Sequence, residues 1–149
     1  MAEIETQDVK ARLLRAALPH VAFDGWSDMT FCAACDDAGV APELALLSCP
    51  RGALDLAVCF HHDGDDAMRN ALSKMDVTSM KIRDKITYAV RMRLEVIDDK
   101  EVVRRAATLM ALPQYAGEGA SLIWGTCDQI WTALGDGSED VNWYTKRLS

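Results

Sequence analysis

Apolar residues recur along the chain with the spacing of an α-helix, and the alternating pattern of a β-strand is missing. The clearest stripe consists of Ile82, Ile86, Val90, Leu94 and Ile97, separated by three or four residues. Lysine and arginine side chains occupy the remaining faces of this segment, as in a long amphipathic helix. The pattern predicts an all-α protein.

Helix-ending and helix-starting residues divide the first half of the chain. A helix is expected over residues 6–18, with Pro19 as its end, because proline removes a backbone hydrogen bond. Ser27 is suited to cap a second helix that ends at Gly39. Pro42 suits the first turn of a short third helix that closes near Cys49.

The remaining apolar segments predict five further helices and a final one near the C-terminus. Residues 52–61 are apolar on nearly all sides, which indicates a buried helix. The run HDGDDAM is expected to form a turn before a helix with Met68, Leu72 and Met75. Three helices are expected after it, and they are the helix with the amphipathic stripe, residues 102–112 and residues 116–134. A last segment begins near residue 138.

The length and composition fit a single domain, and the first half of the chain is acidic. The chain has 149 residues, of which 50% are hydrophobic and 26% charged. Residues 1–75 carry a net charge of −6, almost all of the −7 of the whole chain. The polar start MAEIETQDVK is unlike a secretory signal, and no apolar run approaches the length of a membrane span. We therefore expect a cytoplasmic protein of bacterial type.

The helix, glycine turn and short helix over residues 28–49 have the helix-turn-helix pattern. A helix that reads DNA needs lysine or arginine for the phosphates and polar side chains for the base edges. The segment PELALLSC has no basic residue and one acidic residue, Glu43. The sequence therefore predicts the fold of a regulator without its nucleic-acid binding.

Three kinds of sequence motif could indicate a chemical function, and we interpret none of them in that way. The CAAC motif, Cys32 to Cys35, has the spacing of a redox or metal pair, but no strand precedes it and no second pair follows. We interpret the five cysteines as core thiols and HHDGDD as a solvated turn, with no metal and no cofactor. Phosphate loops, nucleophile elbows and Glu-x-x-His pairs are absent, so no catalytic site and no enzyme are predicted.

The second half of the chain is rich in large apolar residues, which an ordinary core would also explain. As a set they suit a pocket for an apolar ligand, because pockets between helices are common sites. The candidate lipid-binding residues are Phe60, Met68, Met75, Ile86, Val90, Ile123, Trp124 and Trp131.

Five blocks of sequence, in this order and spacing, carry a family resemblance. They are ALPHVAFDGWS, CPRGALDLAVCF, IRDKITYAVRMRLE, ALPQYAG and GDGSEDVNWYTKR. Together they resemble the ubiquinone (coenzyme Q) biosynthesis accessory family, which has a TetR-regulator-like fold. The resemblance covers nearly the whole chain, and the last block is highly specific.

The resemblance implies a non-catalytic homodimer in a single TetR-like domain. Residues 1–50 would form a degenerate helix-turn-helix subdomain, and residues 51–149 a helical bundle for lipid binding and dimerisation. The family binds isoprenoid or other lipids and presents ubiquinone precursors to the di-iron hydroxylase of the pathway. Its last block meets the hydroxylase, which makes partner-contact candidates of Asp136, Asp140, Asn142, Trp143 and Tyr144.

Two further expectations complete the sequence interpretation. Family members continue past this block into an amphipathic helix that contacts the membrane peripherally, and we expect that helix to be lacking here. The alternative to the accessory protein is a TetR-type transcriptional regulator that binds a small apolar effector. A second alternative is a thiol or metal protein built on Cys32 and Cys35.

Overall fold

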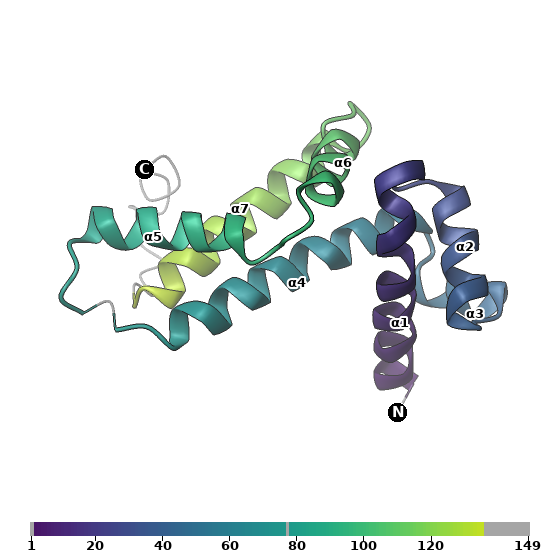
Figure 1. Ribbon diagram of the computed structural model, residues 1–149, viewed down its shortest axis with the longest axis horizontal. Helices are drawn as coiled ribbons and strands as arrows, with labels where there is room; N and C mark the ends of the chain where they lie inside the picture. Colours follow the sequence, from purple (N-terminus) through teal and green to yellow (C-terminus); the bar gives the residue numbers. More distant parts are fainter. Residues whose placement is uncertain (1, 77, 136–149) are drawn as a thin grey trace. The chain divides into compact units, whose positions relative to one another are not determined.

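The computed structural model describes residues 2–76 and 78–135 of the chain, and within them every regular element is a helix (Figure 1). The prediction of an all-α protein is therefore confirmed. The described helices are α1 (Ala2–Asp24), α2 (Asp28–Ala38), α3 (Pro42–Ser48), α4 (Ala53–Ser73), α5 (Ile82–Glu95), α6 (Lys100–Met110) and α7 (Ala116–Ala133).

The caps of α2 form as the sequence predicts. The hydroxyl of Ser27 accepts a hydrogen bond from the Thr30 backbone N–H at 3.3 Å. Gly39 ends the helix with a φ of 62°, a left-handed conformation that glycine adopts without steric cost. Pro42 then begins α3. The short helices and the turn between them therefore follow from local sequence alone.

Helix α1 continues past Pro19, so the predicted end at residue 18 is wrong. Val21, beyond the proline, is fully buried in the same core as Leu13 and Ala17. Pro19 itself is on the exposed side of the helix. Packing of the following turn thus outweighs the local cost of an interior proline.

Helix α4 runs without interruption through HDGDDAM, so the predicted turn is also wrong. Gly64 lies inside the helix, and Asp65 after it is buried, at 1% exposure. The helix places Asp65, Met68 and Leu72 on one inward face, since they are three and four residues apart. Packing of that inward face keeps the segment helical, although its local sequence favours a turn.

The described residues divide into two compact units. The first comprises residues 2–62 and 99–115, and the second comprises residues 63–76, 78–98 and 116–135. The predicted boundary between residues 50 and 51, and the TetR-like arrangement as a whole, stay predictions. None of the described helices is by itself long and apolar enough to cross a membrane, although α3 and α4 together pass that test with a 52° bend between them.

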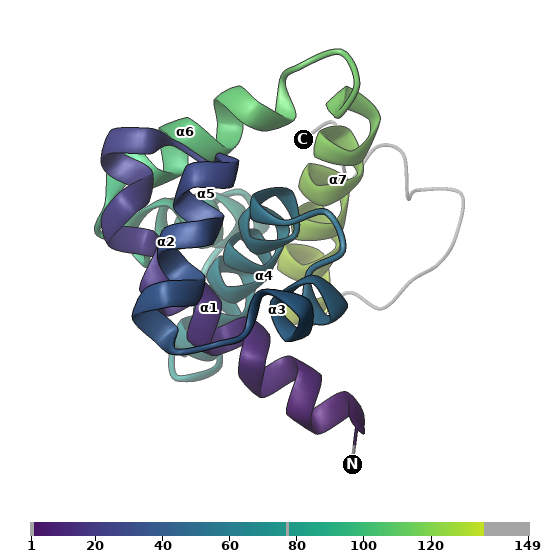
Figure 2. The same cartoon turned by 90° about the vertical axis from the view of Figure 1, so that its right-hand side faces the viewer.

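The first unit is built around α1, which packs against α2, α3 and α6 (Figure 2). Its core contains the buried side chains of Leu13, Val21, Phe31 and Leu56, and Trp26 packs against Phe60 with ring centroids 5.6 Å apart. In the second unit α5 packs against α7. The apolar core there is small and consists of Met68, Leu72, Ala89 and Ile130, with Tyr88 and Leu134 against it.

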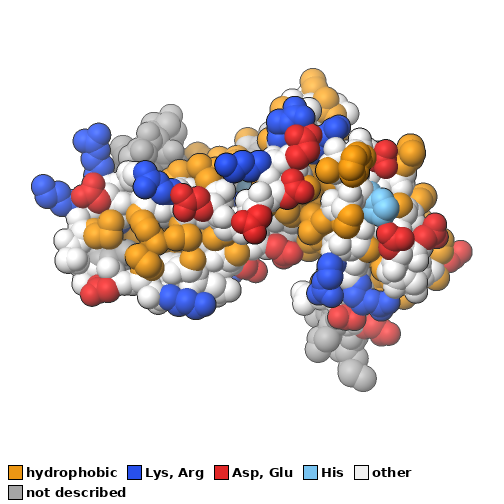
Figure 3. Space-filling view, viewed as in Figure 1, with side chains coloured by type: hydrophobic (Ala, Val, Ile, Leu, Met, Phe, Trp, Pro, Cys, Tyr) orange, Lys and Arg blue, Asp and Glu red, His pale blue; other side chains and the backbone are white. Residues whose placement is uncertain are grey.

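The predicted stripe of α5 does not form the inward face of that helix. Ala89 is fully buried and Tyr88 packs on the core, whereas Ile82, Val90 and Leu94 are exposed. Figure 3 shows a band of apolar side chains on the left-hand part of the face in view, below several Lys and Arg side chains. The reason is that Arg93 points inward to a buried carboxylate, which turns the apolar stripe outward.

Candidate functional site

The second unit has a buried charged group at its centre. The Asp65 carboxylate, on α4, has a side-chain exposure of 2% and forms an ion pair with Arg93 of α5, whose Nε lies 2.6 Å from Oδ1. Taking two charges out of water is costly unless further hydrogen bonds satisfy them. The neighbouring helix supplies those bonds.

Helix α7 contributes two donors to the same carboxylate. The hydroxyl of Thr126 lies 2.9 and 3.0 Å from the two Asp65 oxygens and can donate to either. The Gln129 amide donates from Nε2 to Asp65 Oδ2 at 3.5 Å. Asp65, Arg93, Thr126 and Gln129, which we call the Asp65 network, thus join α4, α5 and α7 through polar contacts.

The absence of a side chain at Gly64 leaves room for the Arg93 side chain against α4. A Cβ atom at Gly64 would lie 2.6 Å from the nearest nitrogen of the guanidinium, well inside contact distance. The glycine is therefore needed for close approach, and its backbone φ is not in the left-handed region. Sequence reasoning read Gly64 as a turn residue and missed this role.

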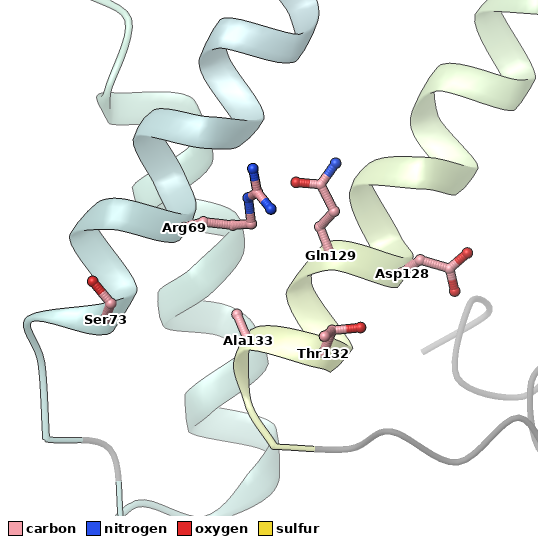
Figure 4. A pocket seen from close by; sticks show the side chains of 6 residues that line it. All are labelled: Arg69, Ser73, Asp128, Gln129, Thr132 and Ala133. Atoms are coloured by element: carbon pink, nitrogen blue, oxygen red, sulfur yellow. The ribbon is translucent and has the colours of Figure 1, made fainter.

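A pocket opens between α4 and α7 beside the Asp65 network. It has a cavity volume of about 310 Å³, and we call it the α4–α7 pocket (Figure 4). Apolar atoms make up most of its surface, and the residues that line it are Arg69, Ser73, Asp128, Gln129, Thr132 and Ala133. Gln129 belongs to both the pocket and the network.

The candidate lipid residues are distributed over core and surface. Met68 is fully buried in the core of the second unit, and Ile86 and Trp131 are half-buried. Phe60 belongs to the first unit, where it packs against Trp26. The others are exposed, and they are Met75, Val90, Ile123 and Trp124.

The structure therefore places Phe60 and Met68 in cores and four of the candidates on the surface of the second unit. Whether any of them binds lipid stays a prediction. The partner-contact candidates Asp136, Asp140, Asn142, Trp143 and Tyr144 lie outside the described residues.

The five cysteines are free thiols that differ in exposure. Burial raises the pKa of Cys35, and it raises that of Cys49 to about 11, so both thiols are protonated at neutral pH. Cys32 is exposed, so the interpretation of all five cysteines as core thiols is wrong for that residue. Among residues 2–76 and 78–135, no group of three or more His, Cys, Asp or Glu side chains is arranged to hold a metal.

Helix α3, in the position of a recognition helix, presents an apolar surface. Leu44, Leu46 and Leu47 are exposed, and Glu43 in its first turn is the charged residue of the helix. A phosphate backbone needs basic contacts for both affinity and positioning. Helix α3 offers none, and the absence of nucleic-acid binding stays a prediction.

Sequence reasoning missed the Asp65 network, although one signal was present. Asp65 precedes Met68 and Leu72 by three and seven residues, the spacing of one helical face. An aspartate in an apolar stripe requires a buried partner. The local sequence does not identify that partner, because Arg93 and Thr126 are 28 and 61 residues away from Asp65.

Comparison with known proteins gives one family and several relatives. The family model described as COQ9 matches residues 116–149. "Ubiquinone biosynthesis protein COQ9, mitochondrial" of Drosophila melanogaster is 29% identical over 94% of this chain and 44% of its own length. "Probable ubiquinone biosynthesis protein coq9, mitochondrial" of Dictyostelium discoideum is 26% identical, over 94% of this chain and 48% of its own length.

The human protein named "Ubiquinone biosynthesis protein COQ9, mitochondrial" is 24% identical over 95% of this chain and 46% of its own length. The chain thus spans less than half the length of each of these three relatives. The family resemblance predicted from the five sequence blocks is supported by both kinds of match.

Proposed function

We propose, on the premise that these matches place the chain with the COQ9 family of ubiquinone biosynthesis, that it is a non-catalytic lipid-binding accessory protein. In this proposal it binds an isoprenoid or other lipid and presents ubiquinone precursors to the di-iron ring hydroxylase. The names of the relatives support a role in ubiquinone biosynthesis. We add four parts to this role, and they are lipid binding, presentation to the hydroxylase, dimerisation and the lack of catalytic activity.

The observation that carries the proposal is the apolar surface of the second unit. Leu94 is 67% exposed and Ile123 is 62% exposed, and Ile82, Val90 and Trp124 are also exposed. Exposed apolar side chains in such number mark contact with another molecule. The same unit has a small core and a charged centre, so these side chains are not needed to hold the helices together.

Mass spectrometry of an organic extract of the purified protein tests lipid binding directly. We expect a bound isoprenoid or phospholipid in a stoichiometric amount, and a decrease to background in Leu94→Asp, because a charge on this surface opposes contact with hydrocarbon. Leu112→Asp, which places the same charge at an exposed leucine of the first unit, is the matched control and should retain the lipid.

An empty extract from a wild-type protein that also takes up no ubiquinone precursor would contradict the proposal. The protein would then be a scaffold for other proteins, and its apolar surface a docking face. No observation favours the alternative of a DNA-binding regulator, since the exposed residues of α3 are leucines beside Glu43.

A further inference from the structure

Helix α3 packs with small side chains inward and large apolar side chains outward. The residues on its inward face, including the C-cap, are Ala45, Ser48 and Cys49, each no more than 3% exposed. Its outward face contains three leucines, and they are Leu44, Leu46 and Leu47, with exposures of 41%, 51% and 76%. A helix on the surface of a globular protein normally places its large apolar side chains against the core. These leucines therefore contribute little to the core of the first unit.

The three leucines and Glu43 share one face of α3. Because successive residues of an α-helix are about 100° apart around the axis, Leu47 lies about 40° from Glu43, four residues before it. Leu46 and Leu44 flank this pair on opposite sides, each about 60° away from its nearer member. Leu47, near the middle of the arc, is also the most exposed of the three leucines. We call Glu43, Leu44, Leu46 and Leu47 the α3 leucine face.

The segment that contains the α3 leucine face is acidic. Residues 24–49 include five acidic side chains and no lysine, arginine or histidine. All five are exposed, and they are Asp24, Asp28, Asp36, Asp37 and Glu43. Two basic residues of α1 come near this segment, Lys10 at Cys49 and Arg12, which donates to a backbone carbonyl at the end of α2 at 2.8 Å. They offset only two of the five negative charges, so the segment keeps a negative excess.

The acidic side chains lie on both sides of the turn that leads into α3. Asp36 and Asp37 are in the last turn of α2, and Glu43 is in the first turn of α3. Asp37 pairs with His20 at 2.7 Å and keeps a side-chain exposure of 58%. Figure 3 shows acidic side chains next to apolar ones along its right-hand edge, where Figure 1 places α2. Exposed apolar area and negative charge therefore occur together on this part of the first unit.

This combination of leucines and acids selects one class of partner. Anionic lipid headgroups and nucleic acids carry phosphates, which acidic side chains repel. A second copy of the chain that docked through the same face would bring the two Glu43 carboxylates together. An amphipathic helix with lysine or arginine beside its apolar stripe meets both features, since the stripe covers the leucines and the bases pair with the acids.

We propose that the α3 leucine face docks a basic amphipathic helix of a protein partner. The apolar stripe of that helix packs on the three leucines, and its lysine or arginine side chains pair with Glu43 and with the acids at the end of α2. Helix α3 has seven residues, so the contact extends over about two helical turns. The proposal uses residues other than those proposed for the lipid and for the hydroxylase, and it does not rest on either function.

Two synthetic peptides test the chemistry of the face. The probe is a short amphipathic helix built of leucine and lysine, and its counterpart has glutamate in place of every lysine. Isothermal titration calorimetry at low salt measures the Kd of each peptide for the wild-type protein. We expect the lysine peptide to bind and the glutamate peptide not to bind, because only the first complements the acidic side chains. Equal binding of the two peptides, or no binding of the lysine peptide, would overturn the proposal.

Matched variants locate the binding site of the lysine peptide. Leu47→Ser should weaken binding about tenfold or more, and Glu43→Gln about two- to fivefold, as for an exposed ion pair. The controls are Leu112→Ser, at a leucine of the first unit with 40% exposure, and Glu95→Gln, at an exposed acid of the second unit, and both should leave the Kd unchanged. All four positions are exposed, so circular dichroism should show an unchanged fold. Equal effects of Leu47→Ser and Leu112→Ser would show that the peptide binds elsewhere.

A photo-crosslinking amino acid in place of Leu47 tests the class of partner in the cells that produce the protein. We expect an adduct to a protein segment that has lysine or arginine beside apolar residues at helical spacing. An adduct to phospholipid, to nucleic acid or to this chain itself would contradict the proposal, as would the lack of any adduct. The lipid content of Leu47→Ser should equal that of wild type, so the docking face and the lipid-binding function are tested independently.

Discussion

At the scale of single residues, the Asp65 network joins the three helices of the second unit through buried polar contacts. Its carboxylate and the Arg93 guanidinium are both largely removed from water, at 2% and 15% side-chain exposure. A buried pair of this kind is a weak source of net stability, yet loss of one partner is strongly destabilising. It also links α4 to α5, because the Arg93 Nε lies 2.6 Å from Asp65 Oδ1.

Asp65→Asn removes one charge of the buried pair with Arg93. We expect the free energy of unfolding to fall by about 3–5 kcal/mol. Urea denaturation followed by circular dichroism measures it. Asp66→Asn, the next residue, changes an exposed pair with Arg69 and should cost less than about 1 kcal/mol. Equal effects of the two substitutions would show that the buried pair is not a stabilising contact.

At the scale of elements, the helices differ in how far local sequence accounts for them. Helix α2 has its cap, its apolar face and its terminal glycine in the sequence, and it forms between those residues. Helix α1 contains Pro19 and forms regardless, because the residues after the proline pack in the core. A helix of this second kind lacks one backbone N–H donor that a substitution can restore.

Pro19→Ala is expected to stabilise the protein by about 1–3 kcal/mol. Alanine restores the missing backbone N–H and removes the clash of the ring, against a smaller loss from the more flexible unfolded chain. Thermal unfolding measures the change. Pro42→Ala, at the first turn of α3 where proline is tolerated, is the control and should change stability little. No gain in Pro19→Ala would show that α1 already accommodates the ring without strain.

Helix α5 shows what a periodic pattern alone cannot decide. The stripe from Ile82 to Leu94 correctly predicts a helix, and α5 spans Ile82–Glu95. Periodicity does not state which face meets the core when both an apolar stripe and an arginine-rich face are present. Here the inward face contains Ala89 and Arg93, and Ile82, Val90 and Leu94 of the stripe are exposed. This outward face is the basis of the proposed lipid contact.

At the scale of the whole molecule, the first half of the chain is acidic and an aromatic pair stands near the C-terminus of the sequence. Helix α3 combines exposed leucines with a single acidic charge, which is a poor surface for nucleic acid. The family model matches residues 116–149, and the partner-contact candidates lie in that range. Contact with the hydroxylase is thus tested best by substitution of those residues.

Trp143→Ala should weaken binding to the ubiquinone-pathway hydroxylase without loss of the fold. Truncation of an aromatic hot spot costs about 2 kcal/mol or more, which is about a 30-fold higher Kd. A pull-down or surface plasmon resonance measures the affinity, and circular dichroism confirms the fold. Phe23→Ala, at an exposed aromatic of the first unit, is the control with no expected effect. An unchanged affinity in Trp143→Ala would remove the hydroxylase from the proposed function.

The sequence by itself determined the helical class, the positions of most helices and the absence of basic residues from α3. These properties depend on local periodicity, on capping residues such as Ser27 and Gly39, and on composition. Its five blocks also pointed to the family that the matches support.

Tertiary structure alone decided that α1 passes Pro19, that α4 passes Gly64, and that α5 turns its apolar stripe outward. Each outcome depends on partners far apart in the chain, as Asp65 is from Arg93 and Thr126. Local propensity assigns a cost to a proline, a glycine or an aspartate in a helix. Whether a distant side chain offsets that cost is decided when the helices pack.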